Sequence, residues 1–131
     1  MTDQQTTAEN AHDAAIAAAE AIRTLNHLTF SKGWAESRPG DVSAVASSLL
    51  RLAEGLPQAL TQLYAELDRL DQADAIRMDN GQEPAVAAGQ TLAAIERTRA
   101  YAEQMRSTLT TAAQGLDHMG GHYQADEDEE L

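Results

Sequence analysis

The stretch from Val42 to Ile76 constrains the fold more than any other part of the chain, because its apolar residues recur in steps of three and four. Steps of this kind place side chains on one stripe along an α-helix. We therefore predict a long amphipathic helix over roughly residues 42–76, which buries one face against another helix. The stripe consists of Val42, Val45, Leu49, Leu52, Leu56, Leu60, Leu63, Leu67 and Leu70.

Pro57 interrupts this stretch, and Gly55 lies two positions before it. Proline has no N–H to donate to the carbonyl of Ala53, and its ring crowds the preceding turn, at a cost of about 3 kcal/mol in an ideal helix interior. The apolar stripe nevertheless continues in phase from Leu56 to Leu70. These features predict a single helix kinked at Pro57, or two nearly collinear helices, and not a reversal of the chain.

Two further amphipathic stretches flank this helix. The same three-and-four spacing predicts a first helix over residues 7–30 and a third helix over residues 84–115. The stripe of the first helix is Ala8, Ala11, Ala15, Ala18, Ile22 and Leu25. The stripe of the third helix is Ala88, Leu92, Ile95, Ala102, Met105, Leu109 and Ala112, interrupted by Arg99, which is expected to extend from the stripe's edge or to pair with an acid on another helix.

Several residues favour the ends of these helices. Asp41 is the predicted N-cap of the second helix, and Pro84 is the predicted first residue of the third. Gly115 is expected to end the third helix in the left-handed conformation. Asn80-Gly81 predicts a turn between the second and third helices, since no alternating strand pattern flanks it.

The fold class that follows is all-α, an elongated antiparallel bundle of three long helices with the second kinked at Pro57. We expect a flexible N-terminus at residues 1–6, a single helical-bundle domain at residues 7–119 and a disordered acidic tail at residues 120–131. The chain has 26 alanines but only one Phe and one Trp, so its core must be thin. A thin core gains from burial against another subunit, and we therefore expect a homodimer.

Charge and composition exclude several classes of function. The net charge is −12, from 21 acids against nine Lys and Arg, and five of the acids lie in the last six residues. With no basic cluster, the chain is not expected to bind nucleic acid or an anionic membrane. The absence of cysteine excludes disulfides and thiolate chemistry. The polar, acidic start and the lack of a long apolar run predict a cytoplasmic protein with no membrane segment.

No enzyme signature is present: the chain has no nucleophile elbow, no phosphate-binding glycine loop and no zinc-protease motif. We predict no catalytic, cofactor-binding or metal-binding residue. His118 and His122 are four residues apart, a spacing that on a helix suits two ligands of a transition metal. Gly120-Gly121 between them opposes a helical arrangement, so a metal site is not favoured.

An interaction protein is the function that remains. Phe30 and Trp34 are the only Phe and Trp, and both lie in the connection at residues 30–40. They either anchor this loop on the end of the bundle or form an exposed contact surface. We predict a non-catalytic adaptor that binds a protein partner through a helix face or the 30–40 loop. The predicted partner-binding residues are Phe30, Trp34, Leu63, Leu67 and Leu70.

Trp34 in a connection between helices, together with the small, Ala-rich and cysteine-free chain, resembles the WXG100 class of helical-hairpin substrates. Tyr123 and Glu127 also match the tyrosine-to-acid spacing in the tails of that class. The motif departs from the family order, because Gly33 precedes the tryptophan and Glu36 stands where the glycine belongs. The resemblance implies an alternative function as a secreted type VII substrate.

Another resemblance rests on the segments 22–27, 49–52, 79–81 and 84–88 and on Leu56-Pro57. In these segments the chain resembles short helical proteins of actinomycete bacteria. That resemblance implies a bacterial protein with a helical fold and no assigned activity. A third function, an acidic mimic of nucleic acid, would follow from carboxylates presented in place of phosphates, but nearly half of the net charge lies in the C-terminal tail.

Overall fold

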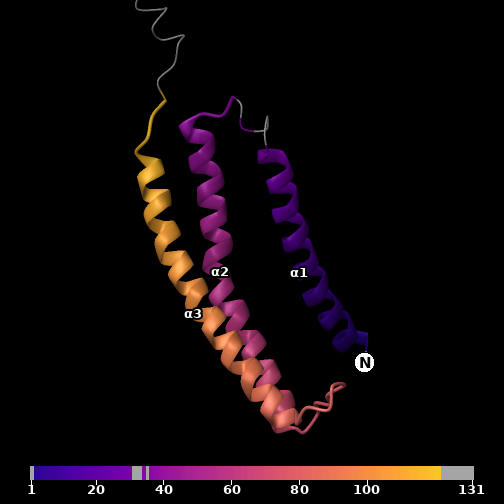
Figure 1. Ribbon diagram of the computed structural model, residues 1–131. Helices are drawn as coiled ribbons and strands as arrows, with labels where there is room; N and C mark the ends of the chain where they lie inside the picture. The colour runs from indigo at the N-terminus through magenta and orange to yellow at the C-terminus, as the bar shows by residue number, and fades with distance from the viewer. Residues whose placement is uncertain (1, 31–33, 35, 122–131) are drawn as a thin grey trace, which may run out of the picture. The chain divides into compact units, whose positions relative to one another are not determined.

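The structure is a computed structural model that describes residues 2–30, 34 and 36–121, with side chains described from residue 10 onwards. This described part contains three α-helices and no β-strand. The predicted all-α fold with three long helices is therefore confirmed. Figure 1 shows the helices, which are α1 (Thr2–Thr29), α2 (Pro39–Gln72) and α3 (Pro84–Asp117).

The chain divides into two compact units, residues 1–37 and 38–131, and α1 is the helix of the first. It begins at Thr2, earlier than the predicted start at residue 7. At its C-terminal end the Thr29 hydroxyl donates a 2.8 Å hydrogen bond to the carbonyl of Leu25. The predicted acidic tail falls mostly on residues 122–131, which lie outside the described residues.

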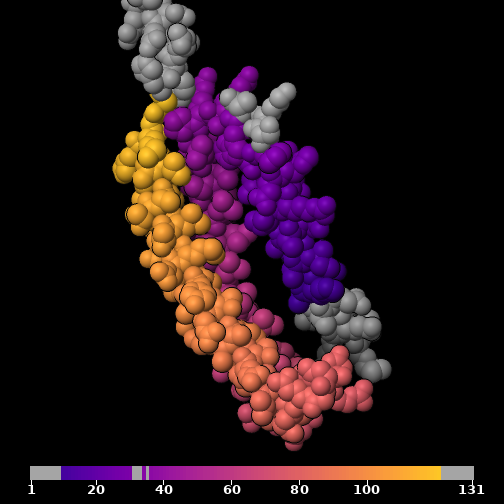
Figure 2. Space-filling model, viewed as in Figure 1, coloured from indigo at the N-terminus to yellow at the C-terminus, as the bar shows by residue number. Residues whose placement is uncertain are grey.

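The second unit is a hairpin in which α2 and α3 pack against each other (Figures 1 and 2). The Ser43 hydroxyl, in the first turns of α2, donates a 2.9 Å hydrogen bond to the carboxylate of Asp117 in the last turn of α3. The two helices are therefore antiparallel. The Ser43–Asp117 bond defines the register of the hairpin. Glu54 and Arg106 lie equally far from this bond along their helices, and the pKa of Arg106, raised mainly by its hydrogen bond to Glu103, is raised further by the charge of Glu54.

Small side chains form the buried core of the hairpin. Alanine keeps two helix axes close together, but each side chain contributes little apolar area. The thin, Ala-rich core expected from composition is thus found between α2 and α3. The buried residues are Ala46 and Ala53 on α2, and Ala87, Ala88, Leu92, Ala102 and Ala113 on α3.

The helix α2 is continuous through Pro57, so the proline does not reverse the chain. Figure 1 shows α2 bending gently along its length without a break. One helical turn after the proline, the Thr61 hydroxyl donates a 2.9 Å hydrogen bond to the Pro57 carbonyl. The predicted continuation of the helix past Pro57 is therefore confirmed. The prediction that its apolar stripe is the buried face is wrong in part, because Val42, Leu52 and Leu63 are exposed and the buried residues of α2 are Ala46 and Ala53.

The N-terminus of α2 differs from the prediction that Asp41 is its N-cap. The cap residue is Arg38, with Pro39 as the first helical residue. Asp41 instead lies in the first turn, where its carboxylate accepts a 3.0 Å hydrogen bond from the backbone N–H of Arg38. A carboxylate at this position satisfies a free backbone donor and interacts favourably with the helix dipole. Pro39 started the helix earlier than predicted because proline suits the first helical position.

The C-terminus of α2 also differs, since the helix ends at Gln72 and not at residue 76. Asp74 has a φ of 53°, in the left-handed region. The N–H of Ala75 then bonds to the carbonyl of Leu70 at 3.0 Å, and that of Asp74 to Asp71 at 3.1 Å. This pattern is a Schellman motif, with Asp74 where glycine is usual. The sequence did not predict this helix end, because the residue in the left-handed conformation is an aspartate and not the glycine that usually marks a helix C-terminus.

The connection at residues 73–83 contains the predicted turn. Gly81 has a φ of 78°, a conformation that glycine adopts without steric cost. The side-chain oxygen of Asn80 accepts a 3.0 Å hydrogen bond from the N–H of Gln82. Pro84 is the first residue of α3, as predicted. The predicted cap at Gly115 is wrong, because α3 continues to Asp117.

Candidate interaction surface

The residues of α3 that face α2 recur in steps of four and three along the whole helix. All of them are buried or half-buried. This spacing is the seven-residue repeat of helices that pack side by side. We call this set the α3 seam, and it comprises Ala88, Leu92, Ile95, Arg99, Ala102, Arg106, Leu109, Ala113 and Leu116.

One side of the hairpin, which we call the polar face, carries the acids next to this seam. It contains the residues that follow the seam positions on α3, including Glu96, Glu103 and Asp117. The bond from Ser43 to Asp117 and the interaction of Glu54 with Arg106 show that α2 contributes to the same face.

Two arginines of the α3 seam turn toward this polar face. Arg99 Nη2 lies 2.8 Å from a carboxylate oxygen of Glu96, and Arg106 Nη2 lies 2.6 Å from one of Glu103. The hydrogen bond from each arginine lowers the pKa of its glutamate. Both pairs lie within α3, three residues apart. Arg99 therefore pairs with an acid of its own helix, and within the described residues no ion pair joins it to an acid of another helix.

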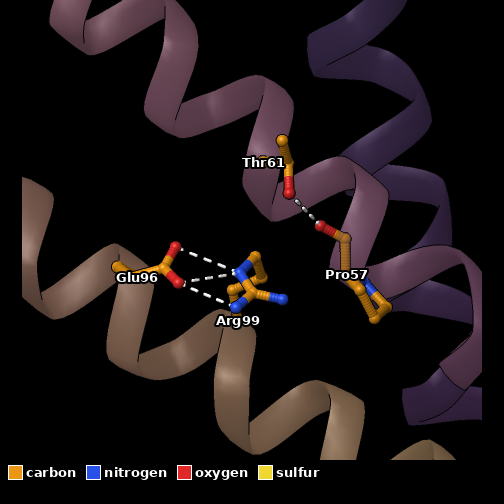
Figure 3. Close-up of polar contacts among 4 residues, drawn as sticks. All are labelled: Pro57, Thr61, Glu96 and Arg99. Carbon is orange, nitrogen blue, oxygen red and sulfur yellow. Dashed lines mark hydrogen bonds and ion pairs between the residues drawn. The ribbon is translucent and has the colours of Figure 1, made fainter.

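Figure 3 shows where Arg99 lies relative to α2. Its guanidinium points toward the turn of α2 that contains Pro57 and Thr61, while Glu96 holds it from the α3 side. An arginine stem at this level fills the space between the helices, and the charged group stays solvated at the edge. The seam therefore accepts a charged residue at the level of the proline turn.

The other side of the hairpin carries no Asp, Glu, Lys, Arg or His over most of its length. On each helix, the residues that immediately precede the contact positions lie together on one side of the contact. When two helices are antiparallel, these sides coincide and form one face of the hairpin. We call this side the uncharged face. It comprises Val45, Leu49, Leu52, Leu56, Ala59 and Leu63 of α2 and Thr91, Ala94, Thr98, Tyr101, Met105, Thr108 and Ala112 of α3.

Several large side chains of the uncharged face are exposed. The exposed fraction is 55% for Leu63, 39% for Leu52, 63% for Tyr101 and 44% for Met105. A group of exposed apolar side chains that excludes charge is typical of a contact surface for another protein. A shallow hollow of about 540 Å³ lies on the α3 part of this surface, and its lining is Tyr101, Gln104, Met105, Thr108, Leu109 and Ala112.

The structure brings together only some of the predicted partner-binding residues. Leu63, Leu67 and Leu70 lie on α2, where Leu67 and Leu70 are half-buried. Phe30 and Trp34 belong to the first unit. Phe30 is 79% exposed, whereas Trp34 is half-buried.

Tyr101 was missed as a surface residue, and Met105 and Ala112 were assigned to the buried stripe of α3. The buried residue near the end of the helix is Ala113, and Met105 is exposed. A second seven-residue repeat on α3 distinguishes the uncharged face from the seam. Each residue of this repeat immediately precedes a seam residue in the sequence. A stripe of small residues next to a stripe of apolar residues leaves open which of the two is buried until the neighbouring helix is known.

The described residues include no group of three or more side chains able to hold a metal ion. His118 is the C-terminal cap residue of α3, and its proposed companion His122 lies outside the described part of the chain. In that described part no helix combines the length and apolar character needed to cross a membrane.

The second unit is thus a helical hairpin with one polar and one uncharged face. We found no match to the chain among protein-family models, curated proteins or solved structures.

Proposed function

We propose that the protein is a non-catalytic helical interaction protein whose binding surface is the uncharged face of the α2–α3 hairpin. The observation that carries the proposal is the exposure of Leu63, Tyr101 and Met105 on a face with no Asp, Glu, Lys, Arg or His. Burying a charge without a partner is costly, so a face free of charge is the one that another protein can cover at least cost. A helix lying along the hairpin is the binding mode that suits such a surface.

The setting we propose is the bacterial cytoplasm. The resemblance to short actinomycete proteins, the high alanine content and the preference for arginine over lysine support it. The type VII alternative gains no separate support, because Trp34 lies between α1 and α2, whereas the connection of the packed hairpin is residues 73–83. The acidic-mimic alternative also gains none, since Glu96 and Glu103 are paired with arginines.

Purification of the tagged protein from its native host tests the proposal, with Leu63→Glu as the face variant. Gln62→Glu adds the same charge one residue away, on an exposed position outside the uncharged face, and serves as the matched control. We expect a bound protein, either a second copy or another chain, that is retained by Gln62→Glu and lost with Leu63→Glu. Equal retention by both variants would place the binding surface elsewhere.

A further inference from the structure

We infer that the occupant of the uncharged face is a second copy of this chain, which rests on the proposed function of that face. The two hairpins are related by a twofold axis parallel to their helices, so that α2 of each copy lies over α3 of the other. All neighbouring helices are then antiparallel. Charge, side-chain size and area each support this arrangement.

Charge limits which surfaces of two copies can meet. The net charge of −12 makes two copies repel each other, most strongly where acids face acids. Contact through the polar face would place Glu54, Glu96 and Glu103 of both copies in one interface. Contact through the uncharged face keeps these acids on the outer surfaces of the pair. The face that is free of charge is therefore the one that a second copy can approach.

Side-chain size makes the uncharged face complementary to itself. The α2 half carries large residues at five of its six positions, with Ala59 as the small one. The α3 half carries Thr or Ala at five of its seven positions, and its two large residues, Tyr101 and Met105, lie near its centre. A twofold axis parallel to the helices sets the large half of each copy on the small half of the other.

The register of the hairpin shows which residues would meet. Rotation about an axis parallel to the helices keeps each residue at its own height along the axis. The Ser43–Asp117 bond shows which residues of α2 and α3 are at the same height within one copy, and the same residues are then at the same height in different copies. Ala59 then lies over Tyr101 of the second copy, so that the small residue of α2 meets the largest residue of α3. At neighbouring levels Leu63 lies over Thr98, and Leu52 lies over Thr108.

The area of the face lies at the lower end of the range for stable interfaces. At about 1.5 Å per residue it extends for about 30 Å along the helices, and two helices side by side are about 20 Å wide. This footprint, on the order of 600 Å² before side-chain relief is counted, approaches the ~800 Å² that each partner buries in a stable interface.

Sedimentation equilibrium of the purified full-length chain tests the inference. We expect a dimer for the wild-type chain and for Gln62→Glu. Leu63→Glu should raise the dissociation constant at least ~100-fold, because twofold symmetry places the new charge in the interface twice. Circular dichroism of each variant checks that helix content is retained. A monomer for the wild-type chain at all concentrations would overturn the inference.

Disulfide cross-linking tests the predicted register without relying on a destabilising charge, since the chain has no cysteine of its own. An equimolar mixture of Ala59→Cys and Tyr101→Cys proteins should form the mixed disulfide faster than either protein forms a homodimer. The control is a mixture of Gln58→Cys with Tyr101→Cys, because Gln58 is exposed and lies off the uncharged face. Equal rates in the two mixtures would contradict the arrangement.

The outcomes separate this inference from the proposed function. If the purified chain is a monomer but Leu63→Glu still loses a different protein in the native host, the inference of a dimer is wrong and the proposed interaction surface stands. If the chain is a monomer and the two variants retain the same proteins, both proposals are wrong.

Discussion

The Ser43 hydroxyl and the Asp117 carboxylate are joined by a 2.9 Å hydrogen bond across 74 residues of sequence. This bond closes the open end of the α2–α3 hairpin, and the connection at residues 73–83 closes the other end. With both ends held, the seven-residue repeats of the two helices remain in phase, so that one side of the hairpin is polar and the other is uncharged.

Removing the Ser43 hydroxyl should weaken the open end of the hairpin. We expect Ser43→Ala to lower the free energy of unfolding by about 0.5–1 kcal/mol, the usual net value of an intramolecular hydrogen bond near the surface. Urea denaturation of Ser43→Ala, Asp117→Asn and the double variant gives the coupling between the two residues. Additive effects would show that the two side chains do not interact in solution.

Ala53 should tolerate no larger side chain. It is 1% exposed, the most buried residue of the hairpin, and it lies between α2 and α3. We expect Ala53→Leu to destabilise the protein by about 1–3 kcal/mol through overpacking. Ala44→Leu makes the same change at an exposed position of the same helix and should leave the thermal midpoint almost unchanged. A similar loss in both variants would contradict the close approach of the helices at Ala53.

Replacing Asp74 with glycine should stabilise the protein. Its φ of 53° costs a residue with a Cβ roughly 1 kcal/mol, and glycine adopts this conformation freely. Part of this gain is offset by the greater entropy of glycine in the unfolded chain. We expect Asp74→Gly to stabilise the protein by up to ~1 kcal/mol and Asp74→Val to destabilise it, as measured by thermal unfolding. A more stable valine variant would argue against the left-handed conformation.

Acid should weaken α3 through its two ion pairs. Hydrogen bonds from Arg99 and Arg106 lower the pKa of Glu96 and Glu103 in the folded state. Carboxylates with a lowered folded pKa stabilise the protein above their unfolded pKa, about 4.3, and lose this contribution as the pH falls through the folded value. The thermal midpoint should therefore fall below about pH 4.

The Glu96→Gln, Glu103→Gln double variant isolates these two pairs. It should be slightly less stable than the wild type at neutral pH and should lose less stability on acidification. Since both glutamates are largely solvated, high salt should reduce the difference at neutral pH. The same acid sensitivity in the wild type and the variant would assign the effect to other carboxylates.

Much of the fold was predictable from sequence because it follows local rules. The spacing from Val42 to Leu70 predicted a long helix through Pro57, and Asn80-Gly81 predicted the turn before Pro84. The helix ends were less predictable where the residue that ends the helix is not of the type that usually does so. Asp74 takes the left-handed position that glycine usually occupies, and Gly115 lies inside a helix.

The interaction surface was only partly predictable, for a different reason. Leu63 was identified as a candidate, but Tyr101 was not, and Met105 was assigned to the core. Two stripes one residue apart on α3 both consist mainly of small and apolar residues, and the buried one contains Arg99 and Arg106, so the position of α2 decides which of them is buried. That position depends on long-range packing, which the periodicity of a single helix does not contain.

Photo-cross-linking from the uncharged face tests the central claim most directly. A photoreactive p-benzoylphenylalanine replaces Tyr101 in one protein and Gln58, outside the face, in the other, and both are irradiated in the native host. We predict protein adducts, to a second copy or to another chain, from position 101 and few or none from position 58. Adducts from position 58 with none from position 101 would contradict the assignment of the uncharged face as the binding surface.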